Sequence, residues 1–391
     1  MPRLWGRIAI ISVALSQLPP SFAVTPVSQP SAGPVKVPEA IDAAEAERRG
    51  FLALGSDKAR AAQWFEQAAS AGRPAAQWAL GTHYFDAKGD ERDVARAVEL
   101  MRAAAVQSFA PAQSFLAWMY LEGQGVAADP KQAFEWFSAA ARQEDAYALR
   151  MLAGFYGNGI ATNRNPELAK RLVLRSAELG NSEAAISAYG MLRHGNAEPR
   201  DPRRAVHFLT KAAKANDARA TYFLGREYLR GYSVQPDPAE AVQWLQRSAE
   251  GGNALASLWL SELHFKGFGV TRDLARAEQL LTDALRRASI HEKNDFAWEL
   301  SVGEDERLRD GTLALRVLEP ALAAVTEKVA AHVDTLAAAY AEVRQFDRAV
   351  QTQQSAIDRA KSERRPQDMI SGMIERLRIY ERGEPYREVA R

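Results

Sequence analysis

The 391-residue sequence contains no cysteine. This absence excludes a disulfide framework, a metal site with cysteine ligands, a catalytic thiol and a lipid anchor attached to cysteine. The absence is harmless in a compartment that oxidises thiols. The stability of the fold must therefore come from packing.

The sequence also lacks an excess of charge of either sign. Its 50 lysine and arginine residues stand against 49 aspartate and glutamate residues, which gives a formal net charge of +1. Nucleic-acid binding depends on a surplus of basic side chains that neutralise phosphates. We therefore expect no nucleic-acid partner.

The apolar run at the N-terminus, residues 8–15, is too short to cross a bilayer, which takes about 20 apolar residues. Arg3 and Arg7 precede this run, and a small-x-small cleavage motif that ends at Ala23 follows it. Residues 1–23 thus have the pattern of a cleaved secretory signal rather than that of a membrane anchor. We expect a mature chain without a membrane span.

Residues 24–38 contain four prolines together with serine and glycine and show little apolar periodicity. This composition is typical of an extended linker. The cleaved signal that precedes this linker predicts a periplasmic or secreted protein.

Motifs of the common catalytic, cofactor and metal sites are missing. No serine is followed by lysine three positions later, no G-x-S-x-G occurs, and the six histidines show no H-E-x-x-H spacing. Gly123-Gln124-Gly125 lacks the third glycine and the lysine of a phosphate-binding loop, so we interpret it as a turn. We expect no catalytic residue, no cofactor and no metal.

What the sequence does contain is an internal repeat of 36 residues. Alanine recurs at this period in two columns of six, without a single insertion. The first column is Ala76, Ala112, Ala148, Ala184, Ala220 and Ala256, and the second is Ala97, Ala133, Ala169, Ala205, Ala241 and Ala277.

Each 36-residue unit has the pattern of two helices. In most units leucine and tyrosine follow the first alanine by four and eight residues, as Leu116 and Tyr120 do, which is the spacing of one helical face. Second helices begin with pairs such as Asp129-Pro130, an N-cap acceptor followed by proline at the first helical position. Such a hairpin cannot bury its apolar faces alone, so the units must stack. The first helices are expected to end at Gly123, Gly159, Gly195, Gly231 and Gly267.

This unit resembles the Sel-one-like repeat, a relative of the tetratricopeptide repeat. The best copy, residues 112–141, contains the string LAWMYLEGQGVAADPKQAFEWFSAAA. The resemblance implies an all-α fold, a right-handed superhelical solenoid of stacked helix hairpins. It extends over residues 39–288, which comprise a partial N-terminal unit around Trp64 and six units of 36 residues. The fourth unit departs from the pattern, with Ala188 in the leucine column.

Beyond Leu285 the repeat frame is lost. Residues 332–360 match the tetratricopeptide spacing at positions that include Leu336, Tyr340 and Ala349. We therefore expect residues 289–391 to form a tetratricopeptide-like C-terminal helical region with a closing helix near residues 370–382.

Proteins of these two families are mainly known as protein–protein adaptors, and their exported bacterial members are associated with envelope assembly and with host or peptidoglycan contacts. The resemblance thus implies an exported, non-catalytic scaffold that binds a partner protein or peptide in a concave groove. The alternative is an envelope enzyme or enzyme inhibitor that acts on peptidoglycan or polysaccharide machinery. The sequence leaves the partner and the oligomeric state open.

Candidate binding residues are those that the tetratricopeptide geometry points inward, two and six positions after the first alanine of a unit. Large aromatic residues and arginine dominate the binding energy of interfaces, which favours the tryptophans, the tyrosine and the arginines of this set. The alternative interpretation is packing between repeats. A peptide and an envelope glycan both remain open as ligands, because tryptophan also stacks on sugar rings. The selected residues are Trp78, Trp118, Arg150, Tyr222, Arg226 and Glu262.

Overall fold

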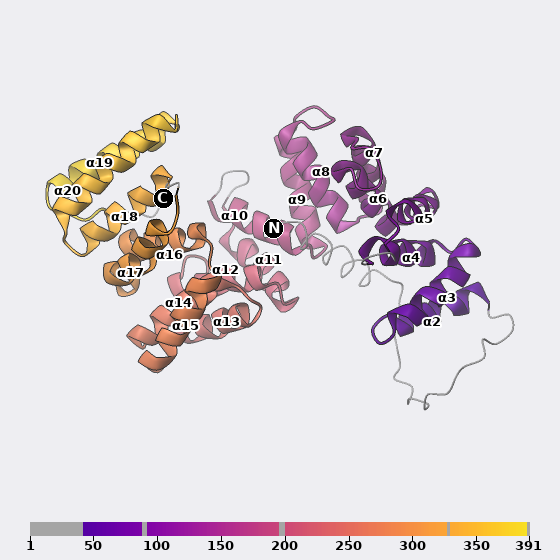
Figure 1. The fold of residues 1–391 in the computed structure, drawn as a ribbon, viewed down its shortest axis with the longest axis horizontal. Helices are drawn as coiled ribbons and strands as arrows, with labels where there is room; N and C mark the ends of the chain where they lie inside the picture. The colour runs from indigo at the N-terminus through magenta and orange to yellow at the C-terminus, as the bar shows by residue number, and fades with distance from the viewer. Residues whose placement is uncertain (1–41, 88–91, 195–199, 327–328, 389–391) are drawn as a thin grey trace. The chain divides into compact units, whose positions relative to one another are not determined.

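The computed structural model of the chain describes residues 42–87, 92–194, 200–326 and 329–388. The expected signal, residues 1–23, and the expected linker, residues 24–38, lie outside this part of the chain. All regular secondary structure within it is helical (Figure 1). None of the helices described there combines the length and the apolar character that a bilayer span requires.

The chain divides into two compact units, residues 1–200 and residues 201–391. The first unit contains α2 (Ala43–Ala53), α3 (Lys58–Ser70), α4 (Pro74–Asp86), α5 (Val94–Val106), α6 (Ala110–Glu122), α7 (Pro130–Ala141), α8 (Ala146–Asn158), α9 (Pro166–Glu178) and α10 (Ser182–His194). The second unit contains α11 (Pro202–Lys214), α12 (Ala218–Arg230), α13 (Pro238–Glu250), α14 (Ala254–Lys266), α15 (Leu274–Arg287), α16 (Ile290–Val302), the 3-10 helix η3 (Glu306–Leu308), α17 (Gly311–Ala323), α18 (Ala330–Glu342), α19 (Phe346–Ser362) and α20 (Gln367–Glu381).

Helices that are neighbours in the sequence pack against each other within each unit. In the first unit this holds without a break from α2 to α10, and in the second from α11 to α15. The following helix, α16, packs against α14, α17 and α18, and α19 lies between α18 and α20. This is the predicted all-α solenoid of stacked helix hairpins. The hairpin of α18 and α19 corresponds to the predicted tetratricopeptide-like unit.

The two alanine columns form the close contacts between helices. Eleven of the twelve alanines have no exposed surface, and Ala169 is partly buried. Glycine allows the same approach behind the leucine column, because a Cβ atom built on Gly225 would lie 2.8 Å from Cγ of Leu245 on the next helix. Small side chains at this period therefore set how closely the helices stack.

The helix ends follow the predicted signals. Gly123 ends α6 with φ of 65°, in the left-handed region, and Gly159, Gly231 and Gly267 do the same for later first helices. Asp129 caps α7 through hydrogen bonds to two backbone N–H groups, and proline follows it at the first helical position. Gly195, the remaining expected helix end, lies outside the described residues.

Candidate functional site

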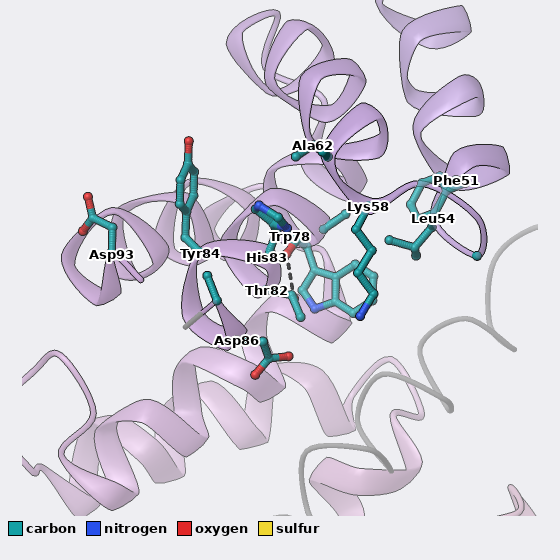
Figure 2. A pocket seen from close by; sticks show the side chains of 14 residues that line it. Phe51, Leu54, Lys58, Ala62, Trp78, Thr82, His83, Tyr84, Asp86 and Asp93 are labelled. Carbon is teal, nitrogen blue, oxygen red and sulfur yellow. Dashed lines mark hydrogen bonds between the residues drawn. The ribbon is translucent and has the colours of Figure 1, made fainter. Parts of the chain in front are cut away.

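A cavity of about 1100 Å³ lies in the first unit, where α2, α3 and α4 meet (Figure 2). Phe51 and Leu54 from the end of α2, Ala62 from α3, and Trp78 and Thr82 from α4 line its apolar part. A volume of this size is typical of sites that hold a ligand of several hundred daltons.

The connection between α2 and α3 is shorter than the matching connection of a later repeat. The matching connection between α6 and α7, residues 123–129, carries Val126 back onto the hydrophobic core. The connection between α2 and α3 comprises only residues 54–57, and it lines the cavity with the side chain of Leu54 and with Gly55, which has no side chain. The small side chain of Ala62 on α3 adds to the open space.

Charged side chains surround the cavity at its rim. Lys58, the first residue of α3, is exposed, and α3 begins there because Asp57 accepts a hydrogen bond of 3.0 Å from the backbone N–H of Arg60. Asp86 and Asp93 are exposed at the rim formed by α4 and the start of α5, and Figure 2 shows Lys58 and Asp93 on opposite sides. Among the described residues Lys58 has no ion-pair partner, whereas Asp93 caps α5 by accepting from the N–H of Arg96.

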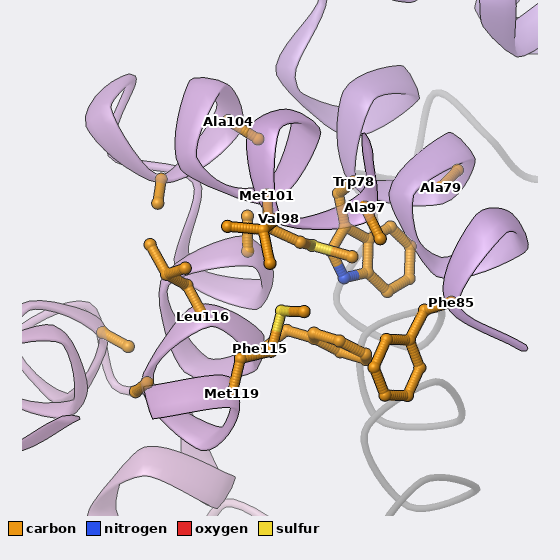
Figure 3. Close-up of a cluster of buried hydrophobic side chains, with 14 of the residues drawn as sticks. Trp78, Ala79, Phe85, Ala97, Val98, Met101, Ala104, Phe115, Leu116 and Met119 are labelled. Carbon is orange, nitrogen blue, oxygen red and sulfur yellow. The ribbon is translucent and has the colours of Figure 1, made fainter. Parts of the chain in front are cut away.

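Trp78 lies at the base of the cavity and is also a core residue. Its side chain is only 2% exposed, and its ring centroid lies 6.1 Å from that of Phe109. Figure 3 shows it within the cluster of buried side chains that includes Met101 and Phe115. Trp78 therefore offers a ligand little more than an edge.

Trp118 and Arg150, the other two predicted residues of this unit, do not line the cavity. Trp118 is half-buried and packs edge-on against Phe85 and Phe115, with ring centroids 5.5 Å away in both cases. Arg150 forms an ion pair of 3.1 Å with Glu183. Neither side chain therefore lines the same cavity as Trp78.

Tyr222 and Arg226 are brought together in the second unit, in an internal cluster. Arg226 donates a hydrogen bond of 2.8 Å to the Tyr222 hydroxyl, lies over the ring of Trp259 at 4.5 Å and pairs with Glu299 at 3.1 Å. Arg230 pairs with the same carboxylate. The two guanidinium groups therefore share one carboxylate within the unit.

Glu262 has no exposed surface. Its carboxylate pairs with Lys266 at 2.7 Å, and the Lys266 ammonium also donates to the backbone carbonyls of Arg307 and Arg309. Burial outweighs this partner and raises the pKa of Glu262 to about 7. A ligand would reach this side chain only if the surrounding helices moved apart.

The sequence pattern did not point to Phe51, Leu54, Lys58 or Ala62 as site residues. They belong to the partial N-terminal unit, and the signal that could have identified them is its shortened loop. The residues that stand two positions after the first alanine of each unit are largely buried. A side chain that points inward in the repeat template is therefore not necessarily accessible to a ligand.

Two histidines that are scattered in the sequence lie together in the second unit. Nε2 of His332 is 3.2 Å from Nδ1 of His291, and burial lowers the pKa of His332. No third histidine or carboxylate of the described residues completes a cation site around them. This pair connects α16 with α18.

The sequence is similar to a known repeat family over more than half of its length. The family model described as Sel1 repeat matches seven segments, at residues 45–72, 74–107, 110–145, 146–181, 184–217, 218–253 and 254–287. The first of these segments is the partial unit around Trp64. None of the curated proteins matches the sequence significantly.

Solved structures show the same fold. One similar structure is that of a protective antigen of uropathogenic Escherichia coli strains, which displays an SLR fold. Its TM-score is 0.57 and its sequence identity is 23%, and the similarity covers 88% of this chain and 73% of the antigen's chain. A second similar structure is that of a Sel1 repeat protein from Oxalobacter formigenes, with a TM-score of 0.55 and 29% sequence identity. The similarity covers 61% of this chain and 99% of the Oxalobacter chain.

Proposed function

The chain belongs to the Sel1 repeat family, and from that premise we propose that it is an exported, non-catalytic scaffold that binds a partner polypeptide at the inner side of its first unit. Sel1 and tetratricopeptide repeats generally mediate protein–protein interaction. The observation that carries the proposal is the cavity between α2, α3 and α4, whose apolar wall and charged rim are accessible to a partner. The internal cluster around Glu299, by contrast, has no comparable opening.

Export rests on the signal pattern of residues 1–23 and places the scaffold in the periplasm or outside the cell. N-terminal sequencing of the protein recovered from its native host tests this step. A mature chain that begins at Val24 in the exported fraction supports the proposal. An intact Met1 start in the cytoplasmic fraction would contradict it.

The scaffold role is tested by crosslinking the tagged protein in its host, identifying the captured proteins by mass spectrometry, and titrating each purified candidate against the purified chain. A candidate that is captured reproducibly and then binds saturably supports the proposal. The alternative, an envelope enzyme or enzyme inhibitor, predicts a different result: no saturable protein partner, together with cleavage of purified peptidoglycan or inhibition of a peptidoglycan hydrolase by the chain alone.

A further inference from the structure

We propose that His291 on α16 and His332 on α18 form a pH-sensitive switch, which keeps the start of α18 packed against α16 at neutral pH and releases it when both rings carry an extra proton. The two rings belong to the C-terminal helices of the second unit, beyond the last Sel1 repeat (Figure 1). The inference goes beyond the proposed scaffold function and does not depend on the partner that the first unit binds. It is carried by the distance between the rings, the burial of one of them and the charges around them.

The two rings are close enough to share one hydrogen bond. Nε2 of His332 lies 3.2 Å from Nδ1 of His291, and the ring centroids are 5.1 Å apart. A neutral imidazole has one N–H and one lone pair, so two neutral rings can form an N–H···N bond here. The rest of the packing between the two helices includes a hydrophobic cluster with Leu300 of α16 and Ala339 of α18, which pH does not change.

The pair keeps its hydrogen bond with one extra proton but not with two. With one extra proton, the ring of His291 is the imidazolium and donates from Nδ1 to the lone pair on Nε2 of His332. When both rings are imidazolium ions, each of the two facing nitrogens carries a hydrogen and neither can accept. The hydrogen bond is then lost, and two positive charges lie side by side. The second proton is therefore the one that opens the contact.

Burial makes this second proton unfavourable. His332 is 4% exposed, whereas His291 is exposed and can be protonated in contact with water. Nδ1 of His332 is buried and has no hydrogen-bond partner among the described residues, so a charged ring would also leave an N–H unsatisfied on its inner side. Burial, followed by the charge of His291, lowers the pKa of His332.

Two carboxylates near the pair act in the opposite direction and do not cancel this effect. Asp295 on α16 and Glu363 at the end of α19 favour the charged form of His332, but they act more weakly than burial and the partner ring. Glu363 is already engaged, because it accepts a hydrogen bond of 3.0 Å from the backbone N–H of Ala330. The balance of charges around His332 therefore still favours the neutral ring.

The charged side chains of α17, and the arginine through which α20 contacts α18, have partners of their own. The two charged side chains of α17 pair with residues of α15 and α19. From α20, Arg376 pairs with Asp334 of α18 at 2.7 Å. Their charges are thus balanced by partners other than His332.

The folded pair binds fewer protons than two histidines of the unfolded chain. An unfolded histidine titrates near pH 6.5, and burial makes the folded His332 resist protonation there. The contact is fully present above about pH 6.5 and weakens as the pH falls below this value. Burial of Glu262 in the same unit makes stability depend on pH in the opposite sense, so the switch is measured by comparing variants at two pH values.

The test is hydrogen–deuterium exchange of the purified protein near pH 7.5 and near pH 5, corrected for the intrinsic pH dependence of amide exchange and followed by mass spectrometry. We expect the protection of peptides from α18 to fall about fivefold at the lower pH, which is the effect of losing one hydrogen bond of ordinary strength. Peptides from α6 and α7, a hairpin without histidine, should show no such fall.

Two conservative variants remove the titrating rings one at a time. His291→Asn keeps a side chain that can form hydrogen bonds and should abolish the fall in protection. His332→Gln should do the same from the buried side of the pair. The matched control is His207→Asn, which removes another exposed histidine of the second unit and should leave the fall unchanged.

NMR of protein labelled with carbon-13 at histidine reads the protonation of the rings directly. The His332 signal should titrate below the usual pH range of histidine. Its pKa should rise in His291→Asn, because the charge of the neighbouring ring is then absent.

Three results would overturn the inference: equal protection of α18 at the two pH values, a fall that persists undiminished in His291→Asn, or a His332 signal that titrates in the usual range and does not respond to His291→Asn. These failures differ from failure of the scaffold function, because partner binding is measured at one pH and on the first unit. A partner that binds saturably leaves the scaffold in place even if the histidine pair proves insensitive to pH.

Discussion

Arg226 of α12 and Glu299 of α16 form an ion pair of 3.1 Å, and the Arg226 guanidinium covers the ring of Trp259 on α14. Arg230, one turn after Arg226, pairs with the same carboxylate. Three helices of the second unit are thus connected on one face. This contact joins the last Sel1 repeats to the C-terminal helices that the family model does not match.

Glu299→Gln should destabilise the second unit by about 2–3 kcal/mol. The substitution removes the carboxylate that Arg226 and Arg230 share, and the side chains of these two arginines are only 13% and 19% exposed. Urea unfolding followed by circular dichroism measures the loss.

The control for Glu299→Gln is Glu278→Gln, which removes the anion of another pair between an arginine and a glutamate. Both side chains of the Arg316–Glu278 pair are nearly half exposed, so its removal should cost less than about 1 kcal/mol. Equal losses in the two variants would contradict the structural role of Glu299.

Because of Glu262, the free energy of unfolding should fall as the pH rises from about 4.5 to about 7. The fold favours the neutral carboxyl, whose pKa is raised by burial from 4.5 to about 7, so the folded state binds a proton that the unfolded state has released in this interval. The stabilisation by the neutral carboxyl of Glu262 is fully present below pH 4.5 and is lost as the pH passes 7. The free energy of unfolding falls by about 3 kcal/mol in total over this interval.

The comparison that isolates this effect is Glu262→Gln, because other groups titrate in the same range. The free energy of unfolding of the wild type should fall between pH 5 and pH 8 by about 2–3 kcal/mol more than that of the variant. Lys266 and Asp310 are the charged groups that act on Glu262, and both are present in the variant as well, so the difference between the two curves reports Glu262. Parallel curves for the two proteins would show that Glu262 is ionised throughout.

The hairpin fold was predictable because its signals are local and repeated. The burial of Ala76 and its counterparts, the left-handed end of α6 at Gly123 and the cap at Asp129 each follow from residue type and spacing. Repetition turns weak individual signals into one consistent register.

The site was harder to predict because accessibility depends on several helices at once. Trp78 and Tyr222 occupy positions that face inward in the template, yet neighbouring aromatic rings cover them. The pairing of Arg226 with Glu299 depends on a residue 73 positions away in a region without the 36-residue frame. Part of the cavity wall comes from the connection of residues 54–57, which is shorter than its counterpart between α6 and α7, and a repeat pattern describes only what recurs.

Two glycines in the middle of helices should respond in opposite directions to the same change. Gly225→Ala in α12 should cost about 1–3 kcal/mol, because its Cβ atom would lie 2.8 Å from Cγ of Leu245 and 3.3 Å from the carbonyl oxygen of Ala241. Gly154→Ala in α8 should stabilise by about 0.5–1 kcal/mol, because a Cβ atom there meets nothing within 4 Å and alanine is the better helix former. Thermal unfolding of both variants measures the difference, and a loss at Gly154 would mean that its helix face is covered.

Trp78→Ala should destabilise the first unit by about 3–5 kcal/mol, whereas Trp118→Ala should cost clearly less. Trp78 is 2% exposed and its removal opens a cavity in the core, but Trp118 is half-buried and part of its ring already faces solvent. Thermal and urea unfolding of the two single variants give the two costs.

Loss of partner binding in Trp78→Ala would therefore reflect lost packing as much as a lost contact. Ala62→Trp is the better probe of the cavity, because it adds atoms to open space and leaves the core around Trp78 and Phe109 in place. If Trp78→Ala unfolds at the wild-type temperature, the ring is not packed as the structure shows, and its role at the cavity would have to be argued again from binding data.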